Sequence, residues 1–406
     1  MILWEIFKMS VGALKVNRLR AFLTLLGVII GVSSVITIIS ALEGLSQSIR
    51  DELNQLGPST FIVNRIGMPM SEEEFFKALK RRPLKYEYAD AILDGCKDCE
   101  KTAVESTTRG EIKYRNKKLR RARLEGITSS YIDIINTEIA QGRFHTIDED
   151  HTRSRVALIG STIQEELFSG IDPIGKAIKI NNIKYRVIGI AKKQGATFDE
   201  DADKVVKIPH SAFVKDFVSR RFGMAIYVKA KSVELLPDAM DQARVVLRAY
   251  RHVPYNKDDD FGIITADAIM AIINDVTRYI RFGLIGVSSI ALVVGGIIIM
   301  NIMMVSVTER TREIGIRKSV GARQKDVLLQ FLYESLLLSL GGGIIGIAIG
   351  VILGDVLINL IKMDMTPSIF AIAVGLAIST GTGLFFGIYP AMKAARMQPV
   401  KALSYE

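Results

Sequence analysis

Residues 21–42 read AFLTLLGVIIGVSSVITIISAL, a run of about 22 residues without a charged side chain. About 20 apolar residues in a helix cross the hydrocarbon core of a bilayer. Similar runs occur at residues 282–307, 327–361 and 369–389. A cleavable signal peptide would have a shorter apolar core, and no small-residue cleavage site precedes Glu43. We therefore expect an α-helical membrane protein with transmembrane helices at residues 21–43, 278–307, 327–361 and 369–389.

The composition agrees with this division. The 406 residues are 49% hydrophobic and 24% charged, with a mean hydropathy of +0.26. The apolar excess is concentrated in the four runs, which excludes a purely cytosolic enzyme and a disordered protein. The net charge of +10 suits either nucleic acid or a membrane surface, so the positions of the charges decide between them.

Basic residues cluster before the first run, between the second and third runs, and after the fourth. The clusters are Lys8, Lys15, Arg18 and Arg20; Arg310, Arg312, Arg317, Lys318, Arg323 and Lys325; and Lys393, Arg396 and Lys401. The turn between the third and fourth runs has only Lys362, beside Asp364. Because basic residues near helix ends stay on the cytoplasmic side, we expect a multi-pass protein of the cell membrane with both termini cytoplasmic. Nucleic acid is not an expected partner.

Residues 44–277 then lie outside the membrane and are long enough for one or two domains. Alternating or β-branched runs predict strands at residues 60–65, 111–115, 119–127, 155–159, 176–180, 184–190, 204–208 and 225–229. Helical patterns lie at residues 71–79, 129–135, 161–168, 211–219 and 233–250, and several begin at a serine suited to an N-cap. Asn181 and Asn182 predict a hairpin turn. The sequence indicates a large α+β extracytoplasmic domain.

No catalytic, cofactor or metal site is predicted in this domain. Residues 170–177, GIDPIGKA, match a phosphate-binding loop except that Ala177 replaces the hydroxyl residue that holds magnesium. The four histidines lack ligand spacing, and the acidic runs at residues 199–201 and 258–260 suit solvated loops. The protein is therefore expected not to be an enzyme.

Cys96 and Cys99 are the two cysteines of the chain. One such pair does not complete a four-ligand zinc site, and no histidine lies near it in sequence. A local disulfide on the oxidising face is the favoured interpretation, with two free thiols as the alternative.

Glycines recur every four residues in the apolar runs and predict faces of close helix packing. They are Gly27 and Gly31 in the first run, Gly342, Gly346, Gly350 and Gly354 in the third, and Gly383 and Gly387 in the fourth. Ionisable residues are confined to the third run, which has Glu334 and Asp355. Ion-coupled transport needs charged or broken helices near the midplane, so the spans suit a bundle that moves or assembles.

The loop at residues 308–326 carries the densest charge pattern. We expect it to extend the second span as a charged helix that Gly321 stops. A stiff charged helix joined to a span suits docking of a cytoplasmic partner, and a solvated loop is the alternative. Leu3, Phe7 and Val11 fall on one face of residues 1–20, which predicts an amphipathic helix in the inner interface.

The chain also resembles a known family through motifs spread over its whole length. They are NRLRAFLT (17–24), GVIIG (27–31), GRF (142–144), VALIG (156–160), DPIGK (172–176), VIG (187–189), RH (251–252), DDF (259–261), MNIMMVSVTERTREIGIRK (300–318), GAR (321–323), YPAMKAAR (389–396) and ALSYE (402–406). This pattern resembles the permeases of MacB-type, macrolide-exporter-like ABC transporters, which are related to lipoprotein-release permeases and FtsX.

The resemblance implies a homodimer and an outer domain in two parts. The porter-like part corresponds to residues 58–108 and 221–275, and the inserted sabre-like part to residues 110–220. It also implies that a partner ATPase binds ATP and magnesium. Residues 308–326 would then transmit the motion of that ATPase to the outer domain. Because Met1 starts directly at the interfacial helix, we expect a separate ATPase subunit.

The predicted function is the permease subunit of an ABC exporter that works by mechanotransmission and exports drugs, peptides or similar cargo. The expected ATPase-facing residues are Glu309, Arg310, Arg312, Glu313, Arg317, Lys318, Gly321 and Arg323. The alternative is an FtsX-like transducer that regulates an extracytoplasmic partner, such as a cell-wall hydrolase, without cargo. FtsX-type proteins have a shorter outer domain than residues 44–277, which favours the exporter over the transducer.

Overall fold

The computed structural model describes residues 18–54, 56–69, 71–135, 137–193, 196–197, 200–201, 203–217, 223–361 and 369–403. It divides into two compact units, a helical unit built from Met1–Ser46, Asn274–Leu360 and Asp364–Glu406, and an α/β domain built mainly from Gln47–Ile273. The interfacial helix predicted at residues 1–20 falls, up to residue 17, outside the described residues, as does the turn containing Lys362 and Asp364.

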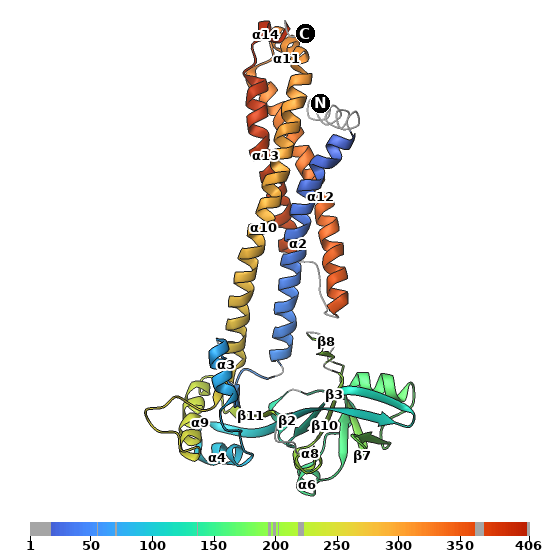
Figure 1. Ribbon diagram of the computed structural model, residues 1–406, viewed down its shortest axis with the longest axis vertical. Coiled ribbons are helices and arrows are strands. Elements are labelled where there is room, and N and C mark those ends of the chain that lie inside the picture. Colours follow the sequence, from blue (N-terminus) through green and yellow to red (C-terminus); the bar gives the residue numbers. More distant parts are fainter. Residues whose placement is uncertain are drawn as a thin grey trace. The chain divides into compact units, whose positions relative to one another are not determined.

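Four long helices lie where the sequence predicts membrane helices, and each is long and apolar enough to cross a bilayer (Figure 1). They are α2 (Arg18–Asn54), α10 (Ala266–Glu309), α12 (Gln324–Ile361) and α13 (Ile369–Ala395). Two of them continue well past their apolar runs, since α2 reaches Asn54 and α10 already begins at Ala266. The 44 residues of α10 measure about 66 Å at 1.5 Å per residue, roughly twice the thickness of a hydrocarbon core.

Small residues set how the helices of this unit pack. On α12, a Cβ added to Gly346 would lie 3.0 Å from the carbonyl oxygen of Ile29, and one on Gly350 would lie 2.9 Å from that of Ser33. Gly342 likewise faces Val28, while Gly354 has more room beside Ser40. The glycine stripe of the third span therefore lies against α2, and only a residue without a Cβ permits this approach.

The glycines of α2 face a different helix. A Cβ on Gly27 would lie 2.6 Å from the Cα of Gly295 on α10, and one on Gly31 would lie 2.8 Å from the side chain of Leu292. The core of the unit is otherwise aliphatic, with Val32, Ile36 and Ile299 fully buried. Two short helices, α11 (Thr311–Ser319) and α14 (Pro399–Leu403), complete it and contact one another.

The α/β domain is built on one ten-stranded mixed sheet. Its strands are β1 (Thr60–Asn64), β2 (Cys99–Tyr114), β3 (Lys117–Ile127), β4 (Ile139–Gly142), β5 (Val156–Ile159), β6 (Ala177–Ile180), β7 (Ile183–Ala191), β10 (Val205–Pro209), β11 (Gly223–Ala230) and β12 (Gly262–Thr265). The short strands β8 (Ala196–Thr197) and β9 (Glu200–Asp201) pair with each other. Its helices are α3 (Glu72–Leu79), α4 (Glu87–Gly95), α5 (Tyr131–Ile134), α6 (Ile147–His151), α7 (Ser161–Ile163) with the π-turn η1 (Gln164–Phe168), α8 (His210–Phe217) and α9 (Leu236–Tyr250).

Six of these strands close on themselves. β2 pairs with β3, β3 with β10, β10 with β5, β5 with β7, β7 with β6, and β6 returns to β2. The hairpin expected at Asn181 and Asn182 joins β6 to β7, and both residues adopt positive φ angles of 43° and 73°. The ring encloses a core that includes Leu124, Ile178 and Val206, so this part of the domain is a small closed barrel.

The other end of the sheet is open. There β12, β1, β11 and the first half of β2 run antiparallel, and α4 and α9 cover them with a second core that includes Phe61, Ile92 and Leu247. The domain thus has a barrel and an open-sheet lobe that share β2. The assignment of porter-like and sabre-like parts to these regions stays a prediction.

Candidate functional site

The segment expected to meet an ATPase has a helix break that the sequence did not predict. α10 ends at Glu309, and Arg310 leaves helical geometry with φ −102° and ψ 15° before α11 begins at Thr311. The expectation of one uninterrupted helix from the second span was therefore wrong. Gly321, at φ +102°, does end the charged helix, because a positive φ is readily adopted by glycine, and α12 starts at Gln324.

Arg310 points into the helical unit rather than toward solvent. Its guanidinium lies 3.1 Å from the carboxylate of Glu334 on α12 and 3.4 Å from that of Glu313 on α11. The Glu334 side chain is only 8% exposed. A buried carboxylate requires a partner of opposite charge, so Arg310 fixes the break between α10 and α11 to the start of α12.

Two further cations of α11 are also bound internally. Arg317 donates to the side-chain oxygen of Gln330 at 2.7 Å and pairs with Glu313 one turn earlier. Lys318 donates to the carbonyl oxygens of Ala395, at the end of α13, and of Met397 at 2.8 Å. Burial lowers the pKa of Lys318. α11 is therefore fixed to both α12 and the end of α13.

The opposite side of α11 has a different character. Arg312, Ile316 and Val320 follow one another at four-residue spacing and are all exposed, with Ile316 at 50% and Val320 at 85%. We call these three residues the coupling face. Glu309, Gly321 and Arg323 are exposed as well, and so is Val400 on α14, which packs beside α11. Ile316 and Val320 were not predicted from the sequence, although apolar residues in a charged helix could have indicated them.

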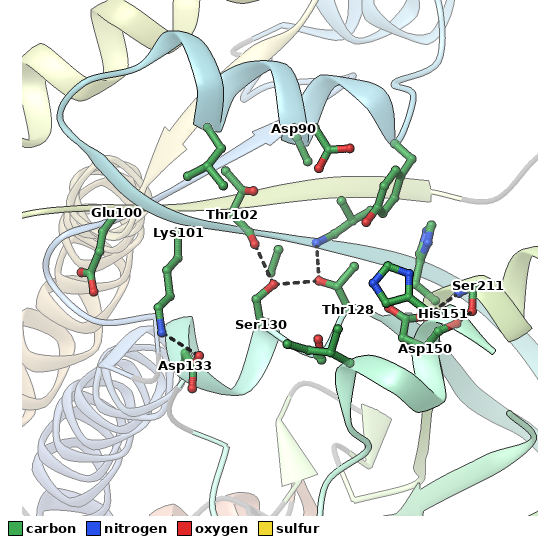
Figure 2. Close-up of a pocket in the computed structure, with 18 of the residues that line it drawn as sticks. Asp90, Glu100, Lys101, Thr102, Thr128, Ser130, Asp133, Asp150, His151 and Ser211 are labelled. Carbon is green, nitrogen blue, oxygen red and sulfur yellow. Dashed lines mark hydrogen bonds and ion pairs between the residues drawn. The ribbon is translucent and has the colours of Figure 1, made fainter. Parts of the chain in front are cut away.

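The α/β domain contains a second candidate site, a cavity of about 940 Å³ beside β2 (Figure 2). Its wall comes from α4, β2, the segment before α5, α6 and the start of α8. Four carboxylates line it, those of Asp90, Glu100, Asp133 and Asp150, together with the cations Lys101 and Arg153. Its size is that of a pocket for a small organic ligand.

Hydrogen bonds fix the polar side of this pocket. The Ser130 hydroxyl donates to the Thr102 carbonyl at 2.7 Å and lies 3.2 Å from the Thr128 hydroxyl, as the dashed lines in Figure 2 show. Lys101 pairs with Asp133 at 2.7 Å. The backbone N–H of Ser211 donates to Asp150 at 3.0 Å. The pocket is thus largely preformed, with more acidic than basic groups.

His210 forms part of the buried wall of this pocket. Its Nε2 lies 3.1 Å from the hydroxyl of the fully buried Ser106, and its ring stacks on Tyr86 at 5.3 Å. Burial lowers the pKa of His210, so the ring is neutral at pH 7. Ser106 has no exposed surface, and the pair therefore packs the wall rather than offering a nucleophile.

The cysteines lie within the open-sheet lobe. Cys96 and Cys99 are joined by a disulfide that connects the end of α4 to the start of β2, and both are buried in the core of that lobe. Across the residues that the structure covers, no three His, Cys, Asp or Glu side chains gather where they could hold a metal ion.

Comparisons with known proteins place these features in a family. A model described as the MacB-like periplasmic core domain matches residues 21–246, and one described as the FtsX-like permease C-terminal matches residues 285–399. The periplasmic region of MacB from Actinobacillus actinomycetemcomitans aligns with 56% of this chain and 97% of its own length, with a TM-score of 0.46 and 20% identity.

Two relatives extend the match to nearly the whole chain. The macrolide export ATP-binding/permease protein MacB of Bdellovibrio bacteriovorus is 32% identical over 398 residues, which are 97% of this chain and 60% of that protein. Its namesake in Chlorobium luteolum is 36% identical over 395 residues, or 96% and 58%. The chain thus spans about 60% of the length of these curated relatives. Since the first family model covers more than half of its residues, the chain belongs to the MacB-like family of ABC transporter permeases.

Proposed function

We propose that this chain is the permease subunit of an ABC exporter in which a separate nucleotide-binding subunit docks on the coupling face. ATP and magnesium are held by that subunit, and the chain itself is not catalytic. Movement of α11 is passed through the helices to the α/β domain, which handles drugs, peptides or similar cargo outside the membrane. The functional unit is a homodimer with both termini of each copy in the cytoplasm.

One observation carries this proposal. α11 is fixed to α12 and to the end of α13 by Arg310, Arg317 and Lys318, while Ile316 and Val320 remain exposed on its other side. A solvated loop has no reason to fix its cations internally and expose its aliphatic side chains. An apolar patch bordered by Arg312 suits a protein interface, since such interfaces have an apolar centre and are enriched in arginine.

The experiment replaces the apolar part of the coupling face. Ile316→Asp with Val320→Asp, in the chain reconstituted with its nucleotide-binding subunit, is expected to lower permease-stimulated ATP hydrolysis by about tenfold or more, as for loss of an interface hot spot. Val245→Asp is the matched control, because Val245 is 67% exposed on α9 in the α/β domain. Unchanged stimulation in the double variant, with normal insertion, would contradict the proposal.

The match of residues 285–399 to the FtsX-like permease C-terminal supports a second candidate. In it, the same movement of α11 regulates an extracytoplasmic partner, such as a cell-wall hydrolase, and no cargo crosses. ATP-dependent accumulation of a peptide or drug in proteoliposomes would favour the exporter. Capture of a hydrolase by the α/β domain, with no accumulation, would favour the transducer.

A further inference from the structure

Four lysines lie side by side across the barrel. Lys118 on β3 is directly opposite Lys113 on β2, Lys113 is opposite Lys179 on β6, and Lys179 is opposite Lys184 on β7. Directly paired residues project from the same face of a sheet. We call Lys113, Lys118, Lys179 and Lys184 the lysine ladder. With strands about 4.8 Å apart, the ladder extends about 14 Å across them.

The ladder lies on the outer surface of the barrel. The residues that alternate with it, Ile112, Leu119, Ile178 and Tyr185, are buried in the barrel core. Arg120 and Arg186 also project outward from β3 and β7, and both are exposed. Together with the ladder, these two arginines place six cations on this part of the outer surface.

Little negative charge offsets them. Glu111 pairs with Lys113 and lies 3.6 Å from Arg120. The pKa of Glu111 is lowered first by its hydrogen bond to Lys113 and also by the charges of Lys113, Lys118 and Arg120. Within the described part of the chain, Lys179, Lys184 and Arg186 form no ion pair. Among the described residues, Glu111 is thus the carboxylate that pairs with these cations, and the surface keeps a large excess of positive charge.

Protection of a free sheet edge does not explain the two inner lysines of the ladder, Lys113 and Lys179. Lysines often guard edge strands against pairing with other chains. Here Lys113 and Lys179 each have a paired strand on both sides, whereas Lys118 and Lys184 lie outside the stretches of β3 and β7 that pair with β10 and β5. Like charges directly opposite one another destabilise a sheet. Binding of an anionic ligand would neutralise these charges and remove the repulsion between them.

The chemistry of the face favours phosphate groups over a protein surface. Among the described residues, β2, β3, β6 and β7 expose no large hydrophobic side chain, whereas protein interfaces use aromatic and apolar anchors and are depleted in lysine. Lysine ammonium groups act as point charges that bind phosphate without a required orientation. The absence of exposed aromatic rings on these strands also gives no platform for stacking bases.

We propose that the lysine ladder binds a linear, phosphate-bearing polyanion that lies across the four strands. Successive phosphates meet successive lysines, and binding releases the counterions that each partner held. This site is separate from the coupling face and from the pocket beside β2, and it goes beyond the proposed exporter function.

The test uses the full chain in nanodiscs of zwitterionic lipid and inorganic polyphosphate as the probe. The dissociation constant is measured over a series of salt concentrations. Replacing the four ladder lysines by glutamine is expected to reduce the slope of log K against log[salt] by about three, since each phosphate contact contributes about 0.7–0.9. Two double variants, K113Q/K179Q and K118Q/K184Q, are each expected to reduce it by about half as much.

The matched control replaces four exposed lysines of the open-sheet lobe and its loops, Lys80, Lys97, Lys231 and Lys257, by glutamine. It changes the net charge equally and is expected to leave affinity within about twofold. An equal loss of polyphosphate affinity in both quadruple variants would show that only net charge matters, and would overturn the proposal. So would polyglutamate binding as tightly as polyphosphate, capture by anionic lipid vesicles without binding of polyphosphate, or no binding by the unaltered chain.

Discussion

The coupling segment and the barrel treat their basic residues in opposite ways. In the coupling segment, Arg310, Arg317 and Lys318 turn inward, and each meets a carboxylate, an amide oxygen or a carbonyl. In the barrel, the lysine ladder turns outward, and Lys179 and Lys184 form no ion pair among the described residues. Basic side chains thus hold one region together and leave the other available to an external anion.

The contrast shows why a count of positive charges does not locate function. Both segments are rich in lysine and arginine, yet the exposed feature of α11 is aliphatic and that of the barrel is cationic. A partner of the first region gains mainly from burial of Ile316 and Val320, and this gain depends little on salt. A partner of the second gains from charge and loses affinity steeply as salt rises.

The largest expected effect breaks the inward side of this comparison. Arg310→Ala leaves Glu334 buried without its cation, which should destabilise the helical unit by about 3–5 kcal/mol. Arg312→Ala, on the exposed side of the same helix, is the control and should change stability by less than about 0.5 kcal/mol. Unfolding of the chain in detergent or bicelles measures both. Similar effects from the two substitutions would contradict the inward role of Arg310.

A smaller effect tests burial of a titratable group without a salt bridge. His145 lies between β4 and α6, is 5% exposed, stacks on Phe144, and its Nε2 has no hydrogen-bond partner. Burial lowers the pKa of His145 to about 4 from the usual 6.5. Between pH 4 and pH 6.5, His145 is therefore protonated in the unfolded chain but neutral in the folded domain. Stability is therefore full above about pH 6.5 and falls toward pH 4, by about 3 kcal/mol.

Hydrogen exchange of barrel amides across this pH range measures the loss for the full chain. His145→Gln removes the titrating group and should flatten the profile between pH 6.5 and 4. His151→Gln is the control, because His151 is exposed on α6. A profile that stays equally steep in the His145 variant would assign the pH dependence to other groups.

The smallest effect sharpens the outward side. Lys179→Gln relieves repulsion from Lys113 and Lys184, so it should stabilise the barrel by a few tenths of a kcal/mol while weakening polyanion binding. Lys231→Gln, outside the ladder, should change neither quantity measurably. A loss of stability in the Lys179 variant would show that the ladder contributes to the fold and would remove the argument from repulsion.

Much of the fold could be predicted because its signals are local. The four apolar runs predicted the four long helices, and alternation located β1, β5, β6, β7, β10 and β11 to within a few residues. The first half of β2 was missed because residues 100–108, EKTAVESTT, lack apolar alternation. α4, β4 and β12 were missed as well, being short and stabilised by tertiary packing.

The candidate sites were less predictable because their partners are distant in sequence. Arg310 meets Glu334, and Lys318 meets the carbonyls of Ala395 and Met397, so the sequence alone could not distinguish inward from outward cations. Lys113 and Lys179 are brought together only by the register of β2 with β6. The pocket beside β2 likewise draws on five separate segments.

The shared strand β2 limits how this domain can be recombined with its relatives. It is a member of the barrel and of the open-sheet lobe, and its register with β3 shifts between Gly110 and Ile112. The barrel therefore cannot be transferred as a separate unit, because removing it would cut β2, which also pairs with β11. A chimera has to be joined within β2. The bulge beside Gly110 is the suitable junction, because the register of the β2–β3 pairing already changes there.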